Sequence, residues 1–234
     1  MPLAPSLLIL ADDPDFVVVC KPIGADSEHD MPALLAQAVG GTPADYYPVH
    51  RLDKAVGGLM VYARNAKVAA ALTAQAQAHT LQKGYLAAAA GSVEPPEGEM
   101  RDYLFKDAAR QKAFPVKKPR KGVKEALLRY RVLDTALAEG APLSLCRVWL
   151  HTGRFHQIRA QFAARKHPLY GDGKYGSRFK GTIGLFSCRL SFLHPGTGQP
   201  LTFEALPPAD ALPWALFAPE AMACEASALS SAAR

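Results

Sequence analysis

Residues 49–60 read VHRLDKAVGGLM, and the rest of the sequence is best understood outward from this stretch. Its single carboxylate, Asp53, stands among basic side chains, directly before an apolar run at 57–63 that predicts a strand. Positive neighbours keep a carboxylate ionised, as an aspartate nucleophile or base requires. The two glycines at the start of the run let backbone or substrate approach closely. The ordinary alternative is a surface ion pair between arginine and aspartate beside a turn.

Short apolar runs bounded by turn residues continue on both sides of this stretch. They predict strands at residues 7–10, 16–20, 57–63, 85–90, 126–133, 143–151, 185–192 and 201–205. Helices are predicted at 33–38, at 65–78 with Asn65 as the N-cap, at 156–165, and around Trp214. A loop is expected at 93–98, and a basic loop or hairpin at 106–122. Strands dominate and helices do not alternate with them, so the prediction is an α+β fold with a mixed, mainly antiparallel central sheet flanked by helices and loops.

A second unusual stretch, residues 150–176, reads LHTGRFHQIRAQFAARKHPLYGDGKYG. On the predicted helix, Ile158 and Phe162 are four residues apart and face the core, and Arg159 lies beside that apolar stripe. A partly buried arginine needs an anion, and its planar fork suits a carboxylate or a phosphate. Arg154 and Arg159 are alternatively ordinary residues of a helix surface. Tyr85, in the sequence QKGY at 82–85, is either a functional residue or simple core packing.

The composition of the 234-residue chain excludes several classes of protein. Hydrophobic residues make up 49% and charged residues 21%, which is typical of a folded globular protein. The start of the chain lacks the basic region of a signal peptide, and no apolar run approaches the ~20 residues of a membrane span, so we expect a cytoplasmic protein without a membrane partner. The cysteines form no C-x-x-C pair, and His151 and His156 are five residues apart, so no metal is predicted. The glycine-rich segment 171–176 lacks the spacing of a nucleotide-binding loop, and we expect no cofactor.

The net charge of +6 is distributed unevenly along the chain. Residues 106–131 contain 10 basic and 2 acidic residues, and residues 147–189 contain 9 basic and 1 acidic, so each segment carries +8. Aromatic residues are interleaved with these basic residues. This pattern favours a polyanion partner with stacking surfaces for bases, and the alternative is a solvated basic face.

Three blocks together resemble the RluA-type RNA pseudouridine synthases in order and spacing. They are HRLDKAVGGLMVYARN at 50–65, QKGYLAAAAG at 82–91, and the stretch 150–176 quoted above. The resemblance extends over roughly residues 7–208, without an S4 RNA-binding module before it. Val56-Gly57 stands where the family usually has Thr-Ser, and Phe155 where a small polar residue is common, which puts local hydrogen bonding in doubt.

The resemblance implies a synthase catalytic domain at 1–208 with a central cleft, followed by a short helix and a flexible tail at 209–234. The implied reaction isomerises uridine in ribosomal RNA, transfer RNA or both, on a monomeric enzyme without a cofactor. Asp53 would be the nucleophile or base, Arg159 would pair with it, and Tyr85 would stack on the uracil or act as a base. Arg51 would fill the gap left by the flipped base. The residues expected to bind RNA are His50, Arg51, Lys54, Lys83, Lys117, Lys118, Arg120, Lys121, Arg154, His156 and Gln157.

Two other functions fit parts of the sequence. A non-catalytic RNA-binding protein would share the fold and the charge, but it would not require a carboxylate among phosphate-binding cations. A small-molecule hydrolase with an aspartate nucleophile would leave the two +8 segments without a purpose.

Overall fold

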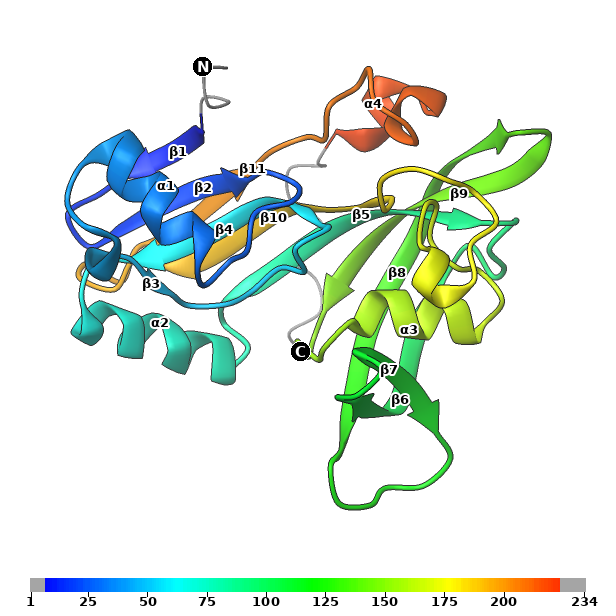
Figure 1. Cartoon of the computed structure of the whole chain (residues 1–234), viewed down its shortest axis with the longest axis horizontal. Coiled ribbons are helices and arrows are strands. Elements are labelled where there is room, and N and C mark those ends of the chain that lie inside the picture. The colour runs from blue at the N-terminus through cyan, green and yellow to red at the C-terminus, as the bar shows by residue number, and fades with distance from the viewer. Residues whose placement is uncertain (1–6, 224–234) are drawn as a thin grey trace.

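The computed structural model describes residues 7–223, and within them eleven strands form one continuous sheet (Figure 1). The strand order is β1-β2-β4-β10-β5-β9-β8-β6-β7, with β11 paired to β10 and β3 paired to β4. Every pairing is antiparallel except that between β4 and β10. The prediction of a mixed, mainly antiparallel α+β fold is therefore confirmed.

The elements follow one another along the chain in an irregular order. The strands are β1 (Leu8–Asp12), β2 (Phe16–Lys21), β3 (Tyr47–Pro48), β4 (Gly57–Ala63), β5 (Gln82–Ala90), β6 (Glu97–Asp107), β7 (Lys112–Val116), β8 (Val123–Ala138), β9 (Ala141–Leu150), β10 (Leu185–Leu193) and β11 (Pro200–Glu204). The helices are α1 (Asp30–Val39), α2 (Ala66–Gln77), α3 (Gln157–Ala164) and α4 (Pro219–Met222), with 3-10 turns at Pro43–Asp45, Gly173–Tyr175 and Trp214–Leu216.

The helices cover alternate faces of the sheet because successive side chains of a strand point to opposite sides. Met60 of β4 packs with Leu35 of α1, whereas Leu59 packs with Leu72 of α2. Helix α2 begins as predicted, since Asn65 Oδ1 accepts a hydrogen bond from the backbone N–H of Val68 at 3.0 Å.

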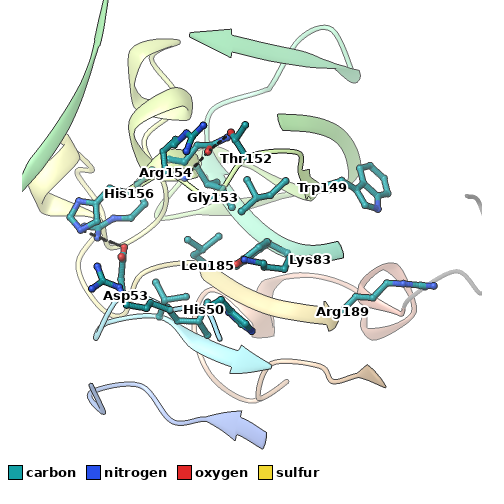
Figure 2. A pocket seen from close by; sticks show the side chains of 18 of the residues that line it. His50, Asp53, Lys83, Trp149, Thr152, Gly153, Arg154, His156, Leu185 and Arg189 are labelled. Carbon is teal, nitrogen blue, oxygen red and sulfur yellow. Dashed lines mark hydrogen bonds and ion pairs between the residues drawn. The ribbon is translucent and has the colours of Figure 1, made fainter. Parts of the chain in front are cut away.

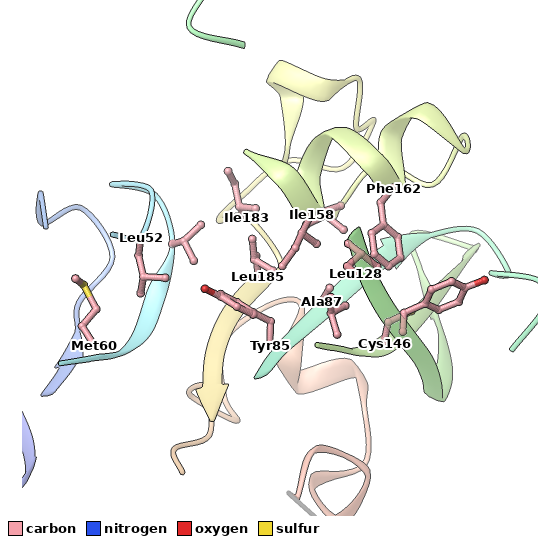
Figure 3. Close-up of a cluster of buried hydrophobic side chains, with 14 of the residues drawn as sticks. Leu52, Met60, Tyr85, Ala87, Leu128, Cys146, Ile158, Phe162, Ile183 and Leu185 are labelled. Atoms are coloured by element: carbon pink, nitrogen blue, oxygen red, sulfur yellow. The ribbon is translucent and has the colours of Figure 1, made fainter. Parts of the chain in front are cut away.

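Helix α3 lies against the half of the sheet that contains β6 and β7, and its apolar side chains join the central core cluster (Figure 3). Ile158 and Phe162 are 4% and 0% exposed, as their spacing predicted. They pack in the same cluster as Tyr85 and Leu128 of the sheet. This packing fixes the helix that carries Arg159 over the strand that carries Tyr85.

The two halves of the sheet meet at a close approach between β4 and β10. Only Gly57 and Gly58 are in register with Phe186 and Ser187. A Cβ atom on Gly58 would lie 2.3 Å from the Ser187 carbonyl oxygen, and the φ of Gly58 is +118°. The prediction that these glycines permit close backbone approach is confirmed, and the approach brings Asp53, just before β4, to the centre of the sheet.

Strand β6 was missed in the sequence prediction, which placed a loop at 93–98 and assigned nothing up to 105. Its buried residues, Met100 and Leu104, are four apart instead of two, because the residue between them on the same face, Asp102, is a half-buried carboxylate paired with Arg165. The strand pairs with β8 along most of its length and with β7 only at its end. The arm that contains β6 and β7 is visible below the sheet in Figure 1, and the predicted hairpin at 106–122 forms its end.

Residues 207–223 pack back onto the sheet. Trp214, Phe217 and Met222 are at most 5% exposed and share a core cluster with Leu86 of β5. The predicted flexible tail after residue 223 lies outside the described residues, as does Cys224. In the part of the chain that is described, no helix is long and apolar enough to cross a membrane.

Candidate active site

Asp53 lies in a short turn that precedes β4 and borders a cavity of about 1190 Å³ (Figure 2). Its carbonyl oxygen accepts a hydrogen bond from the N–H of Val56 at 2.9 Å, which holds the turn. The Asp53 side chain is 24% exposed, so its carboxylate is open to a ligand in the cavity. Tyr85, Arg159 and Leu185 border the same cavity.

Arg159 joins two carboxylates across the fold. Its Nη1 donates to Asp53 Oδ2 at 2.8 Å, while its Nε and Nη2 donate to the two oxygens of Asp172 at 2.7 and 2.9 Å. Burial alone would lower the pKa of Arg159, but the hydrogen bonds and charges of Asp172 and Asp53 raise it above its ordinary value. The prediction that Arg159 is buried beside an anion and lies next to Asp53 is confirmed.

His156 completes the surroundings of the Asp53 carboxylate. Its Nε2 is 3.5 Å from Asp53 Oδ2, and its Nδ1 is 3.1 Å from the hydroxyl of Tyr175. Burial lowers the pKa of His156 to about 4, against the opposing pull of Asp53, so the ring is neutral near pH 7. The guanidinium of Arg159 also lies over the Tyr175 ring, 5.2 Å from its centroid. The carboxylate is thus held by one permanent cation and one neutral ring.

Tyr85 comes from the centre of β5 and is 5% exposed. Its hydroxyl points toward the segment that carries Leu52 and therefore toward the Asp53 turn (Figure 3). Burial, and then the charge of Asp53, raise the pKa of Tyr85. The side chain is consequently a protonated phenol at neutral pH that borders the cavity.

The model of the family described as RNA pseudouridylate synthase matches residues 15–164, which is more than half of the chain. The chain belongs to this family. The RluA-type resemblance found in the sequence is confirmed, and the protein is a pseudouridine synthase, an enzyme that isomerises uridine in RNA.

Individual relatives of this synthase agree with the assignment. It is 35% identical over 176 residues to the ribosomal large subunit pseudouridine synthase D of Neisseria meningitidis, an alignment that spans 69% of this chain and 45% of that protein. It is 28% identical over 222 residues to the tRNA pseudouridine synthase C of Vibrio cholerae, over 85% of this chain and 90% of that protein. The solved structure of human RNA pseudouridylate synthase domain containing 1 superposes with a TM-score of 0.74 at 22% identity, covering 87% of this chain and 84% of that chain. That likeness supports the fold alone.

The residues predicted to bind RNA fall into three groups in the synthase. His50, Lys83, Arg154 and Gln157 border the cavity with His156. Arg51 and Lys54 border it too, but their charges already face Glu28 at 2.7 Å and Asp30 at 3.7 Å. The exposed cations of segment 117–121 lie at the end of the β6–β7 arm and do not border the cavity.

Asp172 and Tyr175 were not among the predicted site residues, although both support the site. Asp172 is 1% exposed and provides the two-oxygen partner that fixes Arg159. The signal was present, because a buried arginine requires an anion and Asp172 is the sole carboxylate in the basic segment 147–189.

Around the cavity, the described residues include no cluster of metal ligands. The one group of three ligand-type side chains that lie close together in residues 7–223 is Asp13 and Asp15, in the turn between β1 and β2, with His194, directly after β10. None of the three borders the cavity, so this group offers no metal to the chemistry at Asp53.

Proposed function

We propose that this synthase converts uridine to pseudouridine in ribosomal RNA, transfer RNA or both, with Asp53 as the residue that makes the reaction possible. The observation that carries the proposal is the pairing of a partly exposed Asp53 carboxylate with a buried Arg159 at the edge of a cavity of about 1190 Å³. The names of the ribosomal and transfer RNA relatives support the choice of RNA class.

The reaction breaks the N1–C1′ bond of the nucleotide and joins C5 to C1′. The hydrogen on C5 is released, and N1 takes up a proton in its place, so the nucleotide keeps its composition. An ionised Asp53 serves this reaction by attacking C1′, by adding to C6, or by assisting removal of the C2′ proton. Each route requires an unprotonated carboxylate beside the ribose.

The neighbours of Asp53 suit that requirement. Arg159 is held by Asp172 whether or not a substrate is present, so it keeps a fixed positive charge on one oxygen of Asp53. A positive neighbour favours the ionised carboxylate. The neutral His156 places no second full charge on that oxygen, and the carboxylate retains its nucleophilic or basic character.

The target base has to leave its stack to reach this cavity. Base flipping costs a few kcal/mol, which stacking on the buried ring of Tyr85 helps to offset. Because the pKa of Tyr85 is raised by burial and by Asp53, we favour the stacking role over the role of a general base. Arg51 borders the cavity with a side chain that is 57% exposed, which supports its proposed role of filling the gap left in the RNA.

The test is the substitution Asp53→Asn, which keeps the shape of the side chain and removes its charge. RNA labelled with tritium at C5 of uridine releases the label into water when C5 is joined to C1′. We expect no release with Asp53→Asn, together with RNA binding within about threefold of the unmodified enzyme. Asp102→Asn is the matched control, since Asp102 also pairs with an arginine near α3 but lies outside the cavity.

Undiminished tritium release by Asp53→Asn would overturn the catalytic assignment. Mapping of pseudouridine in ribosomal and transfer RNA, from cells with and without the gene, then identifies the RNA class. If the gene-deleted cells lose no pseudouridine from either RNA class, the proposed target is contradicted.

A further inference from the structure

Two hydrogen-bond donors in the active-site cavity have no acceptor among the described residues. The first is the ammonium of Lys83, which makes no ion pair with any carboxylate in residues 7–223. The second is Nδ1 of His50, a buried atom without a hydrogen-bond partner. Buried polar groups are almost always hydrogen-bonded, so the fully buried Nδ1 of His50 needs an explanation. Lys83 is half-buried, and its ammonium borders the cavity without a carboxylate partner.

The protonation of His50 follows from its other contact. The Nε2 atom of His50 accepts a hydrogen bond from the N–H of Val61 at 3.4 Å. Burial, and then the charge of Lys83, lower the pKa of His50 well below its ordinary value, so the ring is neutral. A neutral ring that accepts at Nε2 carries its proton on Nδ1. The unpaired Nδ1 of His50 is therefore a donor.

The positive charge of Lys83 is energetically unfavourable in the free enzyme. Burial lowers the pKa of Lys83 to about 8, and no neighbouring charge opposes this effect. Charged or titratable side chains from the same strand and from the segments around it also border the pocket. They are Tyr85 of β5, Asp53 and His50 before β4, His79 after α2, Arg147 of β9, His151 and Arg154 after β9, and Arg189 of β10. A cation kept in such a place without an anion suggests that the anion arrives with the substrate.

The position of the two donors matches a nucleotide next to the target. Lys83 and Tyr85 lie on the same face of β5, two residues and therefore roughly 7 Å apart, which is the scale of one nucleotide step. His50 is three residues before Asp53. Figure 2 shows Asp53 and His156 on one side of the pocket, Trp149 and Arg189 on the other, and Lys83 between them. An RNA strand that leaves the target position has space to continue past Lys83.

We propose that Lys83 and His50 form a subsite that binds the phosphodiester of the nucleotide adjacent to the target uridine. The inference rests on the proposed use of RNA as the substrate of this cavity. A phosphodiester supplies both the negative charge that Lys83 lacks and an acceptor oxygen for His50 Nδ1. A uracil carbonyl would satisfy His50 but would leave the charge of Lys83 uncompensated.

Three variants separate this role from a structural one. In Lys83→Met the uncompensated charge is removed, so we expect an unchanged or higher Tm together with a KM for RNA at least tenfold higher. Lys83→Arg restores the charge and should recover most of the lost affinity. His50→Ala leaves Lys83 in place and should raise KM by a smaller factor. Lys67→Met, an exposed lysine of α2 outside the cavity, is the matched control and should change neither quantity.

Two further measurements report on the phosphate itself. In the unmodified enzyme, KM should rise as the pH passes through about 8, because neutral Lys83 no longer attracts a phosphate. In Lys83→Arg this rise should vanish, since arginine stays protonated. Lys83→Met should also reduce the slope of log affinity against log salt by about 0.7, the value for one phosphate contact on a single strand.

A lower Tm in Lys83→Met with an unchanged salt slope would overturn the proposal, because Lys83 would then be a structural residue. A KM that rises equally through pH 8 in Lys83→Arg would overturn it as well. Inorganic phosphate that competes with RNA in the unmodified enzyme but not in Lys83→Met supports the subsite. The Lys83 variants test only the subsite. The catalytic role of Asp53 is tested separately, by the tritium release of Asp53→Asn.

Discussion

Asp172→Asn should separate the stabilising carboxylate of this site from the reactive one. Asp172 is 1% exposed and binds the buried Arg159 through both oxygens. An asparagine offers only one acceptor and turns an N–H group toward the guanidinium. Removing one partner of a buried ion pair costs about 3–5 kcal/mol, and Arg159 retains Asp53, so we expect the lower end, about 3 kcal/mol.

The same reasoning gives a different outcome for Asp53→Asn. Asp53 accepts a single hydrogen bond from Arg159 and is 24% exposed, while Arg159 keeps both bonds to Asp172. The expected loss of stability is below about 1 kcal/mol. For a protein of this size each kcal/mol corresponds to roughly 2–4 °C, so Asp172→Asn should lower the Tm by about 6–12 °C and Asp53→Asn by less than about 4 °C.

Thermal unfolding followed by circular dichroism measures both values, and tritium release at a temperature where both variants are folded measures activity. We expect Asp172→Asn to retain part of its activity and Asp53→Asn to have none. Asp172 is not the stabilising carboxylate if Asp172→Asn melts within about 2 °C of the unmodified enzyme. The same holds if Asp53→Asn is destabilised as strongly as Asp172→Asn.

Three other predictions concern the fold, the pH response and the RNA-binding arm. Gly58→Ala should prevent folding, because its Cβ would overlap the Ser187 backbone; a soluble variant with a native circular dichroism spectrum would contradict this. The free energy of unfolding should fall as the pH drops from about 6.5 to 4, because the lowered pKa of His156 means that the unfolded chain binds the proton more tightly than the folded chain. Urea titrations measure this fall, and it should be weaker in His156→Gln. Replacing the four basic residues of 117–121 by alanine should weaken RNA binding and reduce its salt slope by up to about 3 if every cation contacts a phosphate, and an unchanged slope would remove the arm from the binding surface.

The sequence was most informative where one local rule decides the structure. The side chain of Asn65 caps α2 because the residue is followed by an uninterrupted helical run, and Ile158 and Phe162 are buried because their spacing matches one helical face. Arg159 could be predicted to need an anion for the same reason. The prediction that Asp53 and Arg159 meet came from the family resemblance and not from the residues themselves.

The sequence was least informative where a contact depends on the path of the whole chain. Strand β6 carries charges at most positions, because one of its faces is largely exposed and Asp102 on the other face pairs with Arg165. The lowered pKa of Lys83 and the unpaired Nδ1 of His50 depend on burial by segments from distant parts of the chain. No local pattern around either residue indicates that burial.

The place of β10 in the sheet has a consequence for synthesis on the ribosome. Strand β10 lies between β4 and β5, although both are made about a hundred residues earlier. Until residues 185–193 emerge, the nascent chain carries two unpaired strand edges that invite association with other chains. Arrival of β10 closes this gap and joins the half that carries Asp53 to the half that carries Tyr85, so the enzyme should gain activity only after most of the polypeptide has been translated.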